Sequence, residues 1–125
     1  MQMRTTGNNF SLEGGLKALA EPTRLTILAL LSKYDQLCVG QLVDALGLPQ
    51  AGVSQHLRVL RYQGIVKVER EGQWAYYGIV PDRVNQITKK VQDIIKGDCQ
   101  ISKEIIRSLE TSTIKHPRHS SENRK

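Results

Sequence analysis

The chain has 125 residues and a mass of 14.1 kDa, a length that fits one domain. Its 39% apolar and 24% charged residues lie in the globular range, and no apolar run is long enough for a membrane-spanning helix. Eighteen Lys and Arg against twelve Asp and Glu give a net charge of +6, which favours nucleic acid over a membrane as the partner. The first nine residues lack a signal peptide's apolar core, so we expect a cytoplasmic protein with reduced cysteines.

The N-terminal third predicts a tail and two helices. Residues 1–9 are polar and are expected to be disordered. Apolar residues at helical spacing predict a helix within 10–20, with Ser11 as its N-cap. Pro22 opens a second helix, which the polar residues 33–36 are expected to end.

Two short amphipathic helices follow, one over 39–46 and one that starts at Pro49 and stops at Gly64. Gly47 supplies a left-handed stop to the first of them. This spacing is typical of a helix-turn-helix, in which the second helix enters the major groove of DNA.

Between Ile65 and Val80 the apolar period changes to two, which predicts a two-stranded ribbon with its tip at 70–73. We expect Trp74 to pack this ribbon onto the helices. Pro81 opens a terminal helix, which Gly97 is expected to break or kink. An apolar stripe typical of a dimer seam follows this helix through Val84, Ile87, Val91, Ile94, Ile101 and Ile105.

These elements predict a mainly helical α+β fold, a winged helix-turn-helix with a two-stranded β-wing and a terminal dimerisation helix. The domain is expected to span residues 10–109, followed by a disordered basic tail over 110–125. We expect the partners to be a second copy of the chain and double-stranded DNA, with no membrane.

The second helix of the motif can present a polar face opposite Val53, Leu57 and Leu60. Gln can pair with adenine through two hydrogen bonds, and Ser and Arg suit bases or phosphates. The alternative is that these groups only solvate a surface helix. The candidate DNA-binding residues on this helix and the ribbon are Gln50, Ala51, Ser54, Gln55, His56, Arg58, Arg61, Lys67, Arg70 and Gln73.

Four segments together resemble the ArsR/SmtB family of homodimeric winged-helix repressors: LAEPTRL at 19–25, LCVGQL at 37–42, LGLPQAGVSQHL at 46–57 and REGQWAYY at 70–77. The resemblance covers about 12–95 and implies release from an inverted-repeat operator by a metal, metalloid or thiol-reactive signal. It also implies that Gln50, Ser54 and Gln55 face bases and that the wing contacts flanking DNA. Gly52 departs from the Ser, Thr or Ala that is usual there.

The two cysteines leave the effector open. Cys38 falls where the arsenic-sensing branch begins a Cys-x-Cys pair, which implies As(III) or Sb(III) as a candidate effector and no required cofactor. Gly40 occupies the second position, and Cys99 could supply another thiolate from either subunit. The sulfide-sensing branch has its first cysteine at the place of Ala29, yet a Cys38–Cys99 disulfide is a redox alternative if the Cα atoms lie within about 7 Å. Both cysteines could also be small apolar fillers in an effector-independent regulator.

Other chemistry finds little support in the sequence. The family's zinc site needs His on the helix after the wing, and residues 82–97 contain none. His116 and His119 lie in the basic tail and are expected to be solvated. Catalytic triads, phosphate loops and paired carboxylates are not recognisable, so we expect no enzyme.

Overall fold

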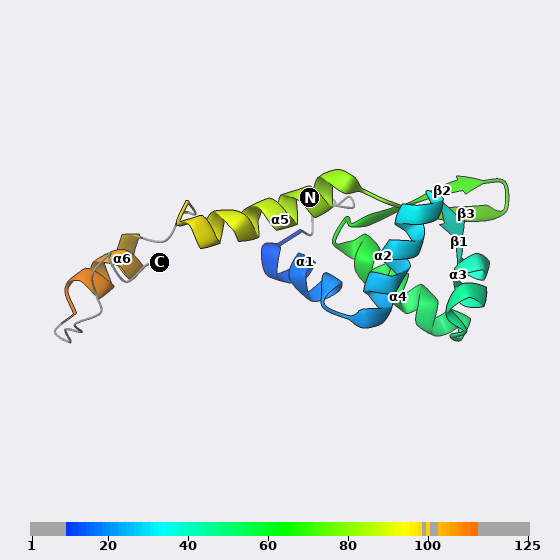
Figure 1. Ribbon diagram of the computed structural model, residues 1–125, viewed down its shortest axis with the longest axis horizontal. Coiled ribbons are helices and arrows are strands. Elements are labelled where there is room, and N and C mark those ends of the chain that lie inside the picture. Colours follow the sequence, from blue (N-terminus) through cyan, green and yellow to red (C-terminus); the bar gives the residue numbers. More distant parts are fainter. Residues whose placement is uncertain (1–9, 99, 101–102, 113–125) are drawn as a thin grey trace, which may run out of the picture. The chain divides into compact units, whose positions relative to one another are not determined.

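The computed structural model describes residues 10–98, 100 and 103–112, and the chain divides into two compact units, Met1–Gln92 and Asp93–Lys125 (Figure 1). Cys99 and the predicted tails at 1–9 and 113–125 lie outside the described residues. The elements are α1 (Leu12–Leu19), α2 (Pro22–Tyr34), β1 (Leu37–Cys38), α3 (Val39–Leu46), α4 (Gln50–Tyr62), β2 (Val66–Glu71), β3 (Trp74–Ile79), α5 (Pro81–Lys96) and α6 (Lys103–Glu110).

The first two helices begin where their capping residues predict. Ser11 Oγ accepts a hydrogen bond from the Gly14 N–H at 3.1 Å, which satisfies one open donor of α1. Pro22 occupies the first turn of α2, and the Glu21 carboxylate accepts from the Arg24 N–H at 2.8 Å. Both predicted helices are therefore confirmed.

The helix-turn-helix is formed by α3 and α4. Gly47 ends α3 in the left-handed conformation with φ of +68°, and its N–H donates to the Val43 carbonyl at 2.9 Å. Pro49 then precedes α4 in extended backbone. The predicted turn through Gly47 is confirmed.

The wing has three strands, in the order β1-β3-β2, and the prediction of two was incomplete. Leu37 pairs with Tyr77 and Cys38 with Tyr76, so β1 adds an antiparallel strand to the ribbon. A strand of two residues is too short to show the period of two by which strands are recognised. The tip is also shorter than predicted, because the pairing extends to Glu71 and Trp74 and leaves a two-residue loop. Gly72 opens that loop with φ of +60°, as glycine does at the first position of such turns.

The core lies in the first unit, and every helix from α1 to α5 contributes to it. Gly15 shows how closely α1 and α5 approach, because a Cβ there would lie 2.8 Å from Ile87 Cδ1. No polar or charged side chain of the described chain is buried in this core. The buried apolar residues are Ala18, Ile27, Leu31, Leu42, Val53, Leu57, Leu60, Ile65, Val66 and Ile87.

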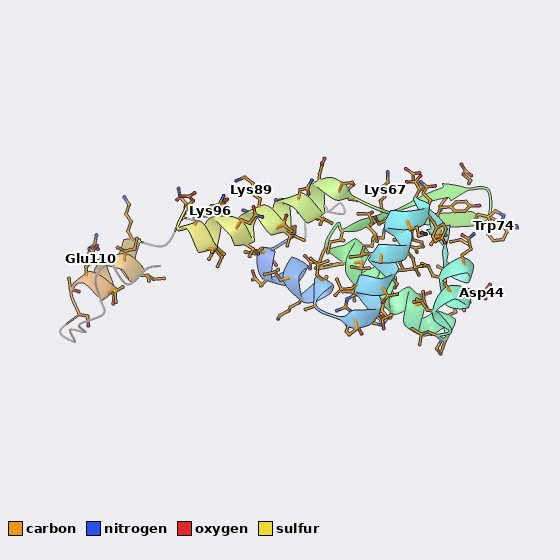
Figure 2. The ribbon with its side chains drawn as sticks, viewed as in Figure 1. Asp44, Lys67, Trp74, Lys89, Lys96 and Glu110 are labelled. Atoms are coloured by element: carbon orange, nitrogen blue, oxygen red, sulfur yellow. The ribbon has the colours of Figure 1, made fainter. Side chains whose placement is uncertain are left out.

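Two observations concern residues outside this core. Gly97 follows α5 with φ of +82°, which confirms the predicted break in the terminal helix. Trp74 is 53% exposed, so the expectation that it packs the wing onto the helices was wrong. It directly follows the hairpin loop, beyond reach of the buried core, and Figure 2 shows it at the outer end of the hairpin. None of the helices in the described ranges is long and apolar enough to span a membrane.

Candidate nucleic-acid interface

Helix α4 has one buried and one exposed face. Val53, Leu57 and Leu60 are all at most 1% exposed, which fixes the opposite side of the helix towards solvent. The predicted candidates Ala51, Gln55 and Arg58 are exposed on that side, and Gln50 is exposed in the first turn. The Arg58 guanidinium donates to Gln55 Oε1, so these two side chains form one polar unit.

The N-terminal end of α4 is open to an anion. Pro49, its N-cap residue, makes no side-chain cap. At Gly52, in the first turn, a Cβ would meet no described atom within 4 Å apart from its chain neighbours and the backbone of its own helix. Uncapped N–H groups at a helix N-terminus favour a phosphate oxygen, which suits an approach to the DNA backbone.

Three other candidates on α4 lie towards its flanks. Ser54 is half-buried. Arg61 is half-buried and lines a hollow of about 320 Å³ with Lys67 of the wing and Arg83 of α5. His56 is half-buried on the side that meets α2.

His56 belongs to a network centred on Arg24. Arg24 Nη1 donates to His56 Nδ1 at 3.2 Å, and Arg24 Nε donates to the Ala18 carbonyl at 2.6 Å. Because an arginine only donates, Nδ1 is the acceptor of this contact. Glu21 Oε1 lies 3.8 Å from the same Nδ1. The network ties the end of α1 and the start of α2 to α4, so His56 positions this helix.

At the base of the wing, a positive and a negative side chain offset each other. Lys67 Nζ lies 3.3 Å from Glu69 Oε2, and Gln36 Nε2 donates to Glu69 Oε1 at 3.0 Å. The hydrogen bond from Gln36 and then the contact with Lys67 lower the pKa of Glu69 below its usual value. Glu69 is therefore ionised at neutral pH and offsets the charge of Lys67. The other wing candidates, Arg70 and Gln73, are exposed.

The hairpin loop and the α3–α4 turn lie at the same end of the first unit (Figure 1). The structure thus brings the start of α4 and the wing tip to one end of this unit. Sequence reasoning missed Tyr62, which is 58% exposed and follows Gln55 and Arg58 at helical spacing on α4. Extending the helical spacing of Gln55 and Arg58 by one more turn leads to Tyr62. Trp74 was assigned to packing, and nothing in its spacing showed that it would be exposed.

Cys38 occupies the junction between the wing and the helix-turn-helix. It is the N-cap residue of α3, and its N–H donates to Gln41 Oε1 at 3.0 Å. It is also half-buried and pairs with Tyr76 of β3. A Cβ at Gly40 would lie 4.0 Å from its Sγ atom.

Cys38 offers one thiolate, whereas a trivalent metalloid prefers two or three. Across the described residues, no cluster of three His, Cys, Asp or Glu side chains could hold a metal ion. The described residues therefore do not complete a metalloid site. The other predicted thiol, Cys99, lies outside them.

Residues 21–68 match a family model described as a bacterial regulatory protein of the arsR family. An HTH-type transcriptional regulator of Methanocaldococcus jannaschii is 46% identical over 78 residues, which cover 62% of this chain and 88% of that relative. The arsenical resistance operon repressor of Escherichia coli K12 is 33% identical, with 74% of this chain and 80% of the repressor covered.

A solved structure shows the same similarity. The crystal structure of the transcriptional repressor PagR of Bacillus anthracis superposes with a TM-score of 0.54 at 40% identity, covering 64% of this chain and 94% of PagR.

Proposed function

This chain belongs to the arsR family of DNA-binding transcriptional regulators, which are not enzymes, and from that premise we propose that it is a repressor that binds an inverted-repeat operator as a homodimer. The observation that carries the proposal is the exposed face of α4, where Ala51, Gln55 and Arg58 stand opposite a fully buried apolar face. Two such helices in a symmetric dimer would enter successive major grooves about 34–36 Å apart.

We further propose that a thiol-reactive effector acts at Cys38, with As(III) or Sb(III) as the first candidate. Cys38 supports this because it is the N-cap residue of α3 and pairs with Tyr76 of β3, so a change at its thiol reaches the first helix of the helix-turn-helix and the wing. Cys99 would supply a second thiolate. The similarity to an arsenical resistance operon repressor supports this class of effector.

The test of DNA binding uses a labelled duplex that spans the DNA upstream of the protein's own coding sequence. We expect affinity to fall steeply between 50 and 200 mM salt, since phosphate contacts release about 6–10 counterions. Arg58→Ala should weaken binding about tenfold and lower the salt slope by about 1. Lys33→Ala removes the same charge from the end of α2 and should change neither. Binding with no salt dependence would exclude the proposed interface.

The test of the effector adds arsenite, an oxidant or a sulfide donor to the protein–duplex complex. Cys38→Ser should bind the duplex normally and fail to release it, because one thiolate is lost while the helix face is intact. Cys99→Ser should also lose release if that thiol completes the site. Normal release by Cys38→Ser would contradict the proposal. Release by oxidant alone would favour a disulfide switch, and release by none of the three would favour an effector-independent regulator.

A further inference from the structure

Trp74 is the only tryptophan of the chain, and it is left exposed at the wing tip. It opens β3 directly after the two-residue loop and pairs with Glu71 across the hairpin. Figure 2 shows its side chain at the outer end of the hairpin, away from Lys67 at the base. No cation or ring contact to its indole is found within the part of the chain that the structure describes. An indole exposed in such a place is available for contact with a partner from outside the fold.

The charge of the wing does not attract DNA. Lys67 and Arg70 are balanced by Glu69 and Glu71, and β3 carries no charged residue. Lys67 is moreover paired with Glu69 at 3.3 Å. Counterion release by the wing as a whole is therefore small, in contrast to the arginine-bearing face of α4. Whatever affinity the wing tip adds must come largely from apolar contact and hydrogen bonds.

The hairpin is long enough to reach a neighbouring groove. The six residues of β2 span about 20 Å at about 3.3 Å per residue. With α4 in a major groove, a strand pair of this length can cross one phosphate backbone to the minor groove beside it. Apolar side chains are the groups that proteins wedge against base steps in that groove.

We propose that the indole of Trp74 lies in the minor groove that flanks each half-site, against the sugars and base edges, and binds there by apolar contact. This inference rests on the proposed function and adds a residue and a mode of contact to it. An apolar wedge favours steps that deform easily, so Trp74 also adds a preference for pyrimidine–purine steps at the flank. The contact contributes affinity without releasing counterions.

The first test needs no variant, because the intrinsic fluorescence of the protein reports on this one indole. An unlabelled duplex from upstream of the gene is added while a labelled copy, in a parallel titration, reports binding by anisotropy. We expect the Trp74 emission to shift to the blue or to be quenched in step with binding. Unchanged emission at saturation would overturn the inference and leave the proposed function standing. If neither fluorescence nor anisotropy detects binding, both the proposed function and this inference are wrong.

The second test compares salt slopes. Trp74→Ala should weaken duplex binding about tenfold with an unchanged salt slope, and Trp74→Phe should recover part of the loss. Arg58→Ala, by contrast, should lower the slope by about 1. Tyr34→Ala removes another exposed aromatic group, from the end of α2, and should have no effect. Unchanged affinity of a folded Trp74→Ala, or a loss accompanied by a lower slope, would overturn the apolar contact.

Discussion

Cys38 presents one thiolate, and the residue two positions further along the chain is a glycine. The place for a Cβ at Gly40 lies 4.0 Å from Cys38 Sγ. A cysteine at this position would carry its sulfur one bond beyond that Cβ. The backbone thus already has the geometry for a pair of thiolates at the start of α3.

We therefore expect Gly40→Cys to raise the affinity for arsenite at least tenfold over the unchanged protein, because a soft metalloid gains a second sulfur ligand. Isothermal titration with arsenite under reducing conditions measures it. Gly40→Ser is the matched control, since it adds a side chain of similar size with a hard oxygen donor. Equal affinity of the two variants would show that the 4.0 Å approach does not form a two-thiolate site.

At the scale of elements, the ion pair between Lys67 and Glu69 limits the charge that the wing can offer to DNA. In Glu69→Gln the amide can still accept from Gln36, but Lys67 loses its counter-charge. We expect tighter binding to DNA of random sequence and a salt slope steeper by up to about 1. Anisotropy titrations at several salt concentrations measure both. Glu110→Gln makes the same charge change on α6, outside the proposed interface, and should leave the slope unchanged.

The sign of the pH dependence follows from the lowered pKa of Glu69. A carboxyl whose pKa is lower in the folded state contributes stability at neutral pH, and loses it as the pH falls through the folded value. The contact with Lys67 should therefore persist from about pH 5 to 8, where Glu69 stays ionised. A wing salt slope that changes within this range would contradict the assigned pair.

The connection from α2 to the wing contains a strained residue. Asp35 has φ of +72° and ψ of −61°, and the Gln36 N–H donates to the Tyr34 carbonyl at 2.8 Å, which closes a γ-turn. A residue with a Cβ costs about 1–3 kcal/mol in such a conformation. We expect Asp35→Gly to raise the free energy of unfolding by about 1 kcal/mol, after the larger chain entropy of glycine is subtracted.

Urea unfolding at a fixed protein concentration measures this change, because association would alter the apparent stability. Asp44→Gly is the control of opposite sign. Asp44 is exposed within α3, where glycine should lower the free energy of unfolding by about 0.5–1 kcal/mol. A loss of stability in both variants would mean that Asp35 is not strained.

Elements with strong local signals could be predicted from the sequence, and elements defined by tertiary contact could not. Ser11, Pro22 and Gly47 mark helix ends through their own backbone preferences, so these boundaries agree with the structure. Strand β1 exists only because Leu37 and Cys38 meet β3, which lies more than thirty residues further along the chain. The exposed face of α4 follows from its buried apolar spacing. The contact of His56 with Arg24 joins two helices, and no periodic pattern in the sequence indicates it.

At the scale of the whole molecule, the second unit carries large apolar side chains that it does not itself cover. Ile94 is 48% exposed and Ile95 is 81% exposed, near the end of α5. Helix α6 has eight residues, none of them buried, although Ile105 and Leu109 are large and apolar. A helix this short is not stable alone in water, and apolar groups in this number require a partner surface. A second copy of the chain would supply it through the predicted seam.

Ile94→Glu should therefore weaken self-association at least about 100-fold, because the symmetric seam would bury two unpaired carboxylates. Operator affinity should fall with it, since a monomer engages only one half-site and loses the gain from linking two. Gln92→Glu adds the same charge to an exposed neighbouring position off the stripe and should remain dimeric. Sedimentation equilibrium and anisotropy on a two-half-site duplex measure the two effects. If Ile94→Glu associates as tightly as Gln92→Glu, the dimer seam does not run along α5. If the unchanged protein is monomeric at micromolar concentration, the symmetric dimer is excluded.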